Sequence, residues 1–331
     1  MDDELRLDGK NRCHGASSRS ILRRDPISVT VTIRTMPPPP LSPLIPIPDF
    51  LTGFTTCTSL NDKRIQIVAL DDQSLGVHRL SHKTTHKTTI PPSPHSPSPD
   101  IPPPDVAWGA YYPKGSINPT APIPGGFSFY LYGPPFFSEA LQGAKEVVMS
   151  YRMMLSEEWD WVKGGKLPGV FGGVGDLAYG CTGGRKEQRC QCFDLRVMWR
   201  PKSVGELYAY LPPTPCNAHQ LSRVPPLSKE NSDYGYSVGR GAFHLDRAVG
   251  RWMSVAFRVK LNDVGEENGE VTLYIDGAPV ISIDGLSLCS SGEGKFTGMH
   301  FQTFFGGHAD DWASSKDQRA WFADVTGVIV E

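Results

Sequence analysis

The first 105 residues contain no tryptophan or tyrosine and only two phenylalanines, Phe50 and Phe54, although they hold 16 of the chain's 30 prolines. A segment with so few aromatic side chains cannot easily bury enough apolar surface to offset the entropy lost on ordering. We therefore expect residues 1–105 to form a disordered leader rich in proline and serine. Residues 106–331 are expected to form one folded domain, and all seven tryptophans and eleven tyrosines lie there.

Long apolar runs and a strong net charge are also missing. No run of about 18 apolar residues exists, so we expect neither a transmembrane helix nor a membrane partner. Residues 1–105 carry 12 basic against 11 acidic side chains, and the remainder carries 21 against 24. Neither part has the excess of basic residues typical of nucleic-acid binding, so no nucleic-acid partner is expected. The acidic start Met1–Glu4 and the proline-interrupted stretch 41–54 do not resemble a secretory signal.

Strand patterns dominate from residue 106 onward. Trp252–Leu261 alternates with period two, and Gly269–Ile275 and Pro279–Ile283 flank an Asp276-Gly277 turn typical of a β-hairpin. No helical heptads and no alternation of strands with helices are evident. The pattern predicts an all-β fold, an antiparallel sandwich or jelly roll with a broad sheet face for a ligand. Further strands are expected at Phe127–Tyr132, Gly298–Phe305 and Trp321–Val330, whereas Ala144–Leu155 fits either a strand or a helix.

The segment Cys192–Leu211 carries the most specific pattern. Two alternating stretches flank a turn at Pro201–Gly205, and in both of them the odd positions are apolar. If the two stretches pair as a hairpin with both apolar sets in the core, Arg196 lies opposite or diagonal to Tyr208 and Tyr210. One arginine and two phenols would then share the other face of the sheet.

Such a set suits the elimination of a 4-linked polymer of uronic acids. A cation must neutralise the carboxylate beside C5, a base must remove the C5 proton, and an acid must protonate the departing O4. Arg196 suits the first role because a guanidinium binds a carboxylate through two donors. Tyr208 or Tyr210 can act as a base only where cations stabilise the phenolate, and Lys166 could supply that charge or act as the base itself.

Other interpretations of these residues stay open. An arginine and tyrosine face is also typical of a solvated sheet or of a simple sugar-binding platform. Glu157, Glu158 and Asp160 invite comparison with hydrolases that use two carboxylates, but a surface loop beside aromatic anchors fits them better. His308 lies close to two aspartates, yet these ligands are too few and too clustered for a metal site. Tryptophan stacking on sugar remains possible at Trp161 or Trp312.

From Gly164 to the C-terminus, six blocks in order resemble polysaccharide lyase family 14, the alginate and glucuronan lyases with a β-jelly-roll fold. The resemblance implies that Lys166, Arg196, Tyr208 and Tyr210 carry catalysis, the same residues that the strand parity and the chemistry of elimination bring forward. The matching blocks are Gly165-Lys166-Leu167-Pro168-Gly169, Gly180-Cys181-Thr182-Gly183-Gly184, Leu195-Arg196-Val197-Met198-Trp199-Arg200, Gly205-Glu206-Leu207-Tyr208-Ala209-Tyr210, Gly239-Arg240-Gly241 and Phe301-Gln302-Thr303-Phe304-Phe305-Gly306-Gly307.

The resemblance implies a monomeric extracellular enzyme that cleaves glucuronan or alginate by β-elimination, without a cofactor or a metal ion. Ser237, Arg240 and Gln302 lie in or beside the blocks and are expected to bind the substrate, or else to hold turns and strand ends. Asp194 is a departure, because family members tend to have serine two residues before the arginine. Its carboxylate would repel a polyuronate or pair with Arg196.

Two alternatives to the lyase follow from these observations. Asp194 could have turned the domain into a non-catalytic module that binds acidic carbohydrate, and a hydrolase would release saturated ends instead. The five cysteines after residue 105 cannot all pair with one another, and one or two disulfides are expected in the loops between Cys181 and Cys216. Their connectivity is not readable from the sequence.

Overall fold

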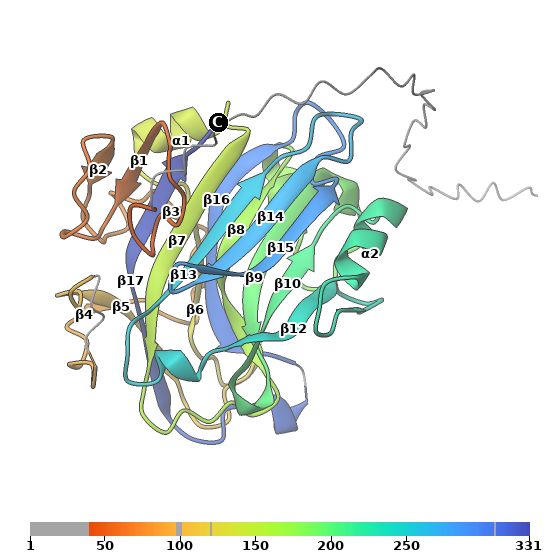
Figure 1. The fold of residues 1–331 in the computed structure, drawn as a ribbon. Helices are drawn as coiled ribbons and strands as arrows, with labels where there is room; N and C mark the ends of the chain where they lie inside the picture. Colours follow the sequence, from red (N-terminus) through yellow and green to blue (C-terminus); the bar gives the residue numbers. More distant parts are fainter. Residues whose placement is uncertain (1–39, 97–100, 120, 308) are drawn as a thin grey trace, which may run out of the picture.

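The computed structural model describes residues 40–96, 101–119, 121–307 and 309–331, which form two packed β-sheets (Figure 1). The predicted antiparallel all-β sandwich is confirmed, since every strand pair in it is antiparallel except that of β1 with β2. The nine-stranded sheet consists of β1 (Thr52–Thr55), β2 (Ile65–Ile67), β4 (Thr88–Thr89), β5 (Ala107–Tyr112), β7 (Glu146–Leu155), β13 (Met253–Lys260), β14 (Gly269–Ile275), β15 (Ala278–Leu286) and β17 (Gln318–Ile329).

The second sheet has eight strands and carries the residues that the sequence singles out. Its order is β11-β12-β10-β9-β8-β16-β6-β3, so strands far apart in the chain are neighbours. These strands are β3 (Val77–His78), β6 (Phe127–Leu131), β8 (Gly165–Gly173), β9 (Cys192–Trp199), β10 (Val204–Tyr210), β11 (Lys229–Glu230), β12 (Tyr236–His244) and β16 (Lys295–Phe305).

Among the described residues, two short α-helices lie outside the sheets. The helix α2 (Pro215–Ser222) begins after Thr214, whose hydroxyl accepts a hydrogen bond from the Asn217 backbone at 3.1 Å, and Pro215 occupies its first turn. The helix α1 (Pro135–Leu141) lies over β16 and β1. No helix in the described ranges is long and apolar enough to cross a membrane. The short 3-10 helices are η1 (Gly175–Gly180), η2 (Arg189–Gln191), η3 (Pro201–Ser203), η4 (Asp246–Ala248) and η5 (Asp310–Trp312).

The core between the sheets follows the period-two patterns. On β13 the side chains of Met253, Val255, Phe257 and Val259 all lie in this core, as the alternation predicts. The stretch that fitted either a strand or a helix is the strand β7, which pairs with β13 on one side and β17 on the other. Every residue of β7 is buried, so both of its faces are covered and no alternation marks it as a strand.

The expected boundary at residue 105 differs from the structure, because residues 40–96 pack onto the domain. Leu44, Ile45 and Phe50 are buried against the outer face of the nine-stranded sheet, where they contact Val148 and Ala256. Aliphatic side chains therefore supply the apolar surface that the scarcity of aromatic residues appeared to exclude. The part of the expected leader before residue 40, including most of the proline tract 37–40, lies outside the described residues.

Backbone pairing also ties this N-terminal segment to both sheets. The strand β1 pairs with β17, and β3 pairs with β6 at the edge of the eight-stranded sheet (Figure 1). The proline-rich stretch that follows is anchored by the buried Arg152, which donates hydrogen bonds to the carbonyls of Ile101 and Pro102 at 3.0 and 2.6 Å. Residues 40–96 are thus part of the folded unit rather than a spacer ahead of it.

Candidate active site

The strands β9 and β10 pair in the register that the alternation predicts. Tyr208 lies directly opposite Arg196, and Tyr210 lies opposite Asp194. Leu195 and Leu207 point from the same strands into the core between the sheets. The arginine and the two phenols therefore share the face of the eight-stranded sheet that is turned away from that core.

Lys166 reaches the same face from the neighbouring strand β8. It lies opposite Met198, and the register shifts between Lys166 and Gly169, which lies opposite Arg196. A Cβ atom on Gly169 would lie 1.8 Å from the carbonyl oxygen of Leu195, so only glycine fits this close approach. Because of this register shift, the Lys166 side chain lies on the same face as Arg196. Strict alternation along β8 would not predict that position.

The lysine and the tyrosines are in direct contact. The Nζ atom of Lys166 lies 3.1 Å from the ring centre of Tyr208 and 5.4 Å from that of Tyr210. All three side chains are nearly inaccessible to solvent, with 7 %, 5 % and 2 % of their surface exposed. The Lys166 Nζ atom has no hydrogen-bond partner among the described residues. An unpaired buried amine of this kind is unusual unless a ligand or a proton transfer makes use of it.

Burial shifts the proton affinities of these groups in opposite directions. Desolvation, together with the charge of Arg196, holds the pKa of the Lys166 amine well below its ordinary value. Desolvation and the neighbouring Tyr210 raise the pKa of the Tyr208 phenol, and burial likewise raises that of Tyr210. The site therefore favours an uncharged amine beside two protonated phenols.

Arg196 is held by two side chains. Its Nη1 atom donates to Oε1 of Gln302 at 2.5 Å, and the Gln302 amide donates in turn to Ser128 at 2.8 Å. The Nε atom of Arg196 lies 3.4 Å from Oδ1 of Asp194, an ion pair whose geometry falls outside a hydrogen bond. Gln302 thus fixes the guanidinium, whose Nε atom has no hydrogen-bond partner among the described residues.

Asp194 is shared between Arg196 and His300. Its Oδ2 atom accepts a hydrogen bond from Nδ1 of His300 at 2.7 Å, and the imidazole stacks on Tyr130 at 4.2 Å between ring centres. Burial would raise the pKa of the Asp194 carboxyl, but the charge of Arg196 and the contact with His300 lower it below its ordinary value. Burial lowers the pKa of His300 to about 4. His300 is therefore a neutral donor at neutral pH.

Glu206 holds three polar side chains in place at the edge of the site next to β12. This fully buried carboxylate accepts hydrogen bonds from Arg200, Ser237 and Arg240, each at 2.6 Å in its shortest contact. Arg240 keeps about a third of its side chain exposed. Arg200, Tyr208, Ser237 and Arg240 line a cleft of about 380 Å³ together with residues 229–232. Two arginines share one carboxylate here, so the cleft wall keeps an excess of positive charge.

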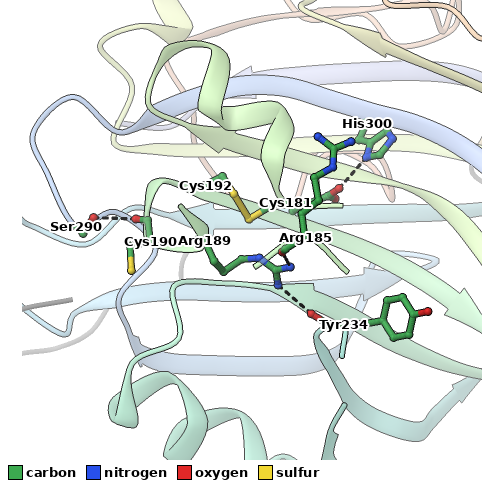
Figure 2. Close-up of a disulfide and its surroundings, with 9 residues drawn as sticks. Cys181, Arg185, Arg189, Cys190, Cys192, Tyr234, Ser290 and His300 are labelled. Carbon is green, nitrogen blue, oxygen red and sulfur yellow. Dashed lines mark hydrogen bonds and ion pairs between the residues drawn. A yellow bond between two sulfur atoms is a disulfide. The ribbon is translucent and has the colours of Figure 1, made fainter. Parts of the chain in front are cut away.

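A disulfide-closed loop covers part of this face. Cys181 and Cys192 are joined, and the loop between them carries Arg189, whose Nη1 atom donates to the Tyr234 carbonyl at 2.9 Å (Figure 2). The Arg189 guanidinium also lies 4.9 Å from the ring centre of Tyr210. The bridge lies within the stretch where the sequence predicts disulfides, and Cys216 has a free thiol. The loop and its disulfide therefore pack on Tyr210, on a face that the sequence predicts to be open to a ligand.

The structure brings the eight predicted residues onto one face, with different surroundings. Lys166, Arg196, Tyr208 and Tyr210 form its centre, whereas Ser237 is engaged with Glu206. Sequence reasoning missed His300 and Glu206, although each shares strand parity with a residue that it had singled out. The described residues include no group of three or more histidine, cysteine, aspartate or glutamate side chains arranged to hold a metal ion, and His308 lies outside them.

Two comparisons with known proteins agree with this geometry. The family model described as Polysaccharide lyase 14 matches residues 105–325, whereas no curated protein sequence matches the chain. The marine PL-14 alginate lyase from Aplysia kurodai is 28 % identical, with a TM-score of 0.63 over 76 % of this chain and 90 % of its own. The alginate lyase vAL-1 from Chlorella virus is 19 % identical, with a TM-score of 0.52 over 77 % of this chain and 93 % of its own, and supports the fold.

The family match covers well over half of the chain and includes all eight predicted site residues. The fold, the order of the sequence blocks and the 28 % identical structure agree with it. The protein is a polysaccharide lyase, and the chain belongs to polysaccharide lyase family 14.

Proposed function

We propose that the protein cleaves 4-linked polyuronates, with alginate or glucuronan as substrate, by a β-elimination that needs no metal ion. The observation that carries the proposal is the contact of Lys166 with Tyr208 and Tyr210 beside Arg196, on one buried face. The Nζ atom of Lys166 and the Nε atom of Arg196 are buried without hydrogen-bond partners among the described residues. Since buried polar atoms normally have partners, these two support a site in which a bound substrate supplies them.

In this proposal Arg196 neutralises the carboxylate of the uronate at the point of cleavage. Its guanidinium is held by Gln302, and its Nε atom has no hydrogen-bond partner among the described residues, which leaves this donor for a substrate carboxylate. Neutralising that charge increases the acidity of the C5 proton, because the carbanion-like transition state spreads its charge into the carboxyl group. Asp194 weakens the contact, since a uronate must compete with it for the same cation.

The proton affinities suggest how the remaining roles are divided. The uncharged Lys166 amine takes the C5 proton, and the electron pair of that C–H bond forms the C4–C5 double bond. The bond from C4 to O4 breaks, and a phenol of Tyr208 or Tyr210 gives its proton to the departing oxygen. Every atom in these steps comes from the substrate or from the three side chains, so no cofactor is required.

The cleft beside β12 suits the neighbouring sugar of the same polymer. Arg240 is partly exposed beside Ser237, and Glu206 fixes both of them. Arg240 would contact a second carboxylate, whereas Ser237 would act chiefly by holding Arg240. We also propose that the protein acts outside the cell as a monomer. The Cys181–Cys192 disulfide is consistent with an oxidising compartment.

The test is to incubate the full chain with alginate, glucuronan and a neutral 4-linked glucan, with and without a chelator. We expect the ultraviolet absorbance of the unsaturated product to rise on at least one polyuronate, in both conditions, and not on the glucan. Lys166→Ala is the control for a contaminating lyase. Saturable binding without product would support a non-catalytic module, and saturated chain ends would support a hydrolase. Activity that the chelator abolishes would overturn the metal-free mechanism.

A further inference from the structure

One row of residues crosses the whole eight-stranded sheet. On one side of Arg196 the strand register leads through Tyr208 to Ser237. On the other side it leads from Arg196 to Gly169 on β8, then to His300 on β16, Tyr130 on β6 and His78 on β3 in turn. The face that holds the proposed catalytic residues therefore continues to the edge strand supplied by the N-terminal segment.

A cluster of three rings lies at that edge, in which His78 and Tyr132 are partly exposed and Tyr179 is buried beneath them. The His78 imidazole stacks on Tyr132 with 3.8 Å between ring centres, and its Nε2 atom lies 2.8 Å from the Tyr179 hydroxyl. The Tyr179 and Tyr132 hydroxyls are 2.9 Å apart. The three rings are therefore fixed by one another rather than free to rotate. Such rings suit a sugar, because the C–H groups of a pyranose pack well against an aromatic face.

A guanidinium lies on the same cluster. Arg79 lies 3.5 Å from the ring centre of Tyr179, and its Nη2 atom donates to the exposed carboxylate of Asp176 at 2.8 Å. Its backbone has a φ of 51°, a left-handed conformation that arginine rarely adopts. Strained backbone of this kind is often found where a side chain must be aimed at a ligand. About half of the Arg79 side chain remains exposed.

The distance from the proposed catalytic centre fits a polymer. Four strand steps separate β9 from β3, which amounts to roughly 19 Å at the usual spacing between strands. Tyr130 lies between the two ends, because its ring stacks on His300 and it pairs with His78. A uronate chain that extends from Arg196 toward β3 would reach Arg79 several sugars away from the bond that is cleaved.

We propose that His78, Arg79, Tyr132 and Tyr179 form a distal subsite for one uronate residue of the polymer. The partly exposed His78 and Tyr132 rings pack against the sugar ring, Tyr179 holds them in place, and Arg79 exchanges Asp176 for the sugar carboxylate. His78 and Arg79 precede residue 105, where the family match begins, so the N-terminal segment extends the binding face of this chain. This inference rests on the proposed function, since it requires a polyuronate at the central site.

Steady-state kinetics of Arg79→Ala on long and short substrates test the subsite. We expect KM on long polyuronate to rise about tenfold, the loss of one charge-assisted contact, with kcat unchanged. KM on a trisaccharide should not change, because so short a chain bound across Arg196 cannot reach β3. Arg79→Lys should recover part of the affinity. Arg319→Ala is the matched control, since Arg319 also lies over a tyrosine ring, Tyr111, but on the other sheet.

Direct binding separates a failure of the subsite from a failure of the proposed function. Titration calorimetry of Lys166→Ala and of the double variant with Arg79→Ala measures the affinity for the polymer without turnover. Equal affinities, or an equal KM on long chains for wild type and Arg79→Ala, would overturn the subsite while leaving the lyase intact. Absence of product from the wild type on every polyuronate would overturn the proposed function itself. Thermal unfolding of each variant checks that the fold is retained.

Discussion

The Nδ1 atom of His300 donates a hydrogen bond to Asp194 at 2.7 Å, deep inside the face that holds the proposed catalytic residues. Both side chains are almost fully buried, with 1 % and 2 % of their surface exposed. The other oxygen of Asp194 lies 3.4 Å from Nε of Arg196. His300 therefore orients the Asp194 carboxylate toward Arg196. Asp194 neutralises part of the positive charge that Arg196 would otherwise offer to a substrate carboxylate.

Replacement of this carboxylate separates substrate affinity from stability. We expect Asp194→Asn to lower KM for a polyuronate, because the amide keeps an acceptor for His300 but no longer competes for Arg196. The same change leaves a buried arginine without its counter-charge, so the free energy of unfolding should fall by about 3 kcal/mol. Kinetics and urea unfolding measure the two effects. The exposed Asp263→Asn serves as the control, and a higher KM in Asp194→Asn would contradict the competition.

The titration of His300 predicts a loss of stability in mild acid. Burial lowers its pKa from 6.5 to about 4, so the unfolded chain binds the proton more readily than the folded protein does. The contribution of His300 to the free energy of unfolding is therefore fully present above pH 6.5, where the imidazole is neutral in both states. It is lost as the pH falls toward 4, because the unfolded chain takes up the proton first. The loss is on the order of 3 kcal/mol. Urea unfolding across this range should show a flatter profile for His300→Gln, whereas the exposed His219→Gln should follow the wild type.

The phenol of Tyr208 is predicted to matter through its proton rather than its packing. Tyr208→Phe keeps the ring against Lys166 and should leave the thermal unfolding temperature nearly unchanged. Without the phenol to protonate the leaving oxygen, kcat should fall by about 10²–10⁴-fold. Initial rates of product absorbance give the value, with Tyr274→Phe on the other sheet as the matched control. A full rate in Tyr208→Phe would assign the acid to Tyr210 instead.

Lys166 should set the acidic limb of the pH–rate profile. Since its pKa is held well below the ordinary value, the wild-type rate should rise with pH as the amine loses its proton and should level off below the range where free lysine titrates. Lys166→Arg places a permanent cation at the site and supplies no base, so its rate should be very low at every pH. Polymer binding by Lys166→Arg, measured by calorimetry, should remain. Appreciable turnover in that variant would rule out the amine as the base.

Alternation made the central part of the site predictable from sequence. Side chains on paired strands alternate between two faces, so the apolar odd positions on β9 and β10 also fixed where Arg196, Tyr208 and Tyr210 lie. His300 was within reach of the same reasoning, because it lies two residues before Gln302 on β16. The place of Lys166 was not, since a register shift on β8 breaks the period. Only the chemistry of its side chain and the resemblance to the family joined it to the others.

Local sequence patterns could not predict the burial of the site or the packing of the N-terminal segment. The loop over part of this face is closed by a disulfide between Cys181 and Cys192, the first residue of β9, and it contacts Tyr234 through Arg189. Residue spacing specifies neither of these two pairings. Residues 40–96 contain few aromatic side chains, yet their aliphatic residues find a ready-made apolar surface on the nine-stranded sheet. Whether a segment folds depends on the surface it can pack against as well as on its own composition.

Phe54 tests whether the N-terminal segment is part of the folded unit. Its side chain is 1 % exposed and its ring meets that of Phe137 edge-on, with 4.8 Å between centres, while its backbone belongs to β1. Phe54→Ala would leave a cavity in the main core, so the free energy of unfolding should fall by about 3–5 kcal/mol. Leu51→Ala, three residues earlier and 65 % exposed, should change it by less than about 0.5 kcal/mol.

Urea unfolding followed by tryptophan fluorescence suits this comparison, because every tryptophan lies after residue 105 and reports on the domain rather than on the segment. A single transition that moves to lower urea in Phe54→Ala means that the segment and the domain unfold together. An unchanged transition would mean that residues 40–96 are dispensable for the domain, as the composition alone had predicted. In that case the edge strand β3, and with it Arg79, could not hold a fixed place on the binding face.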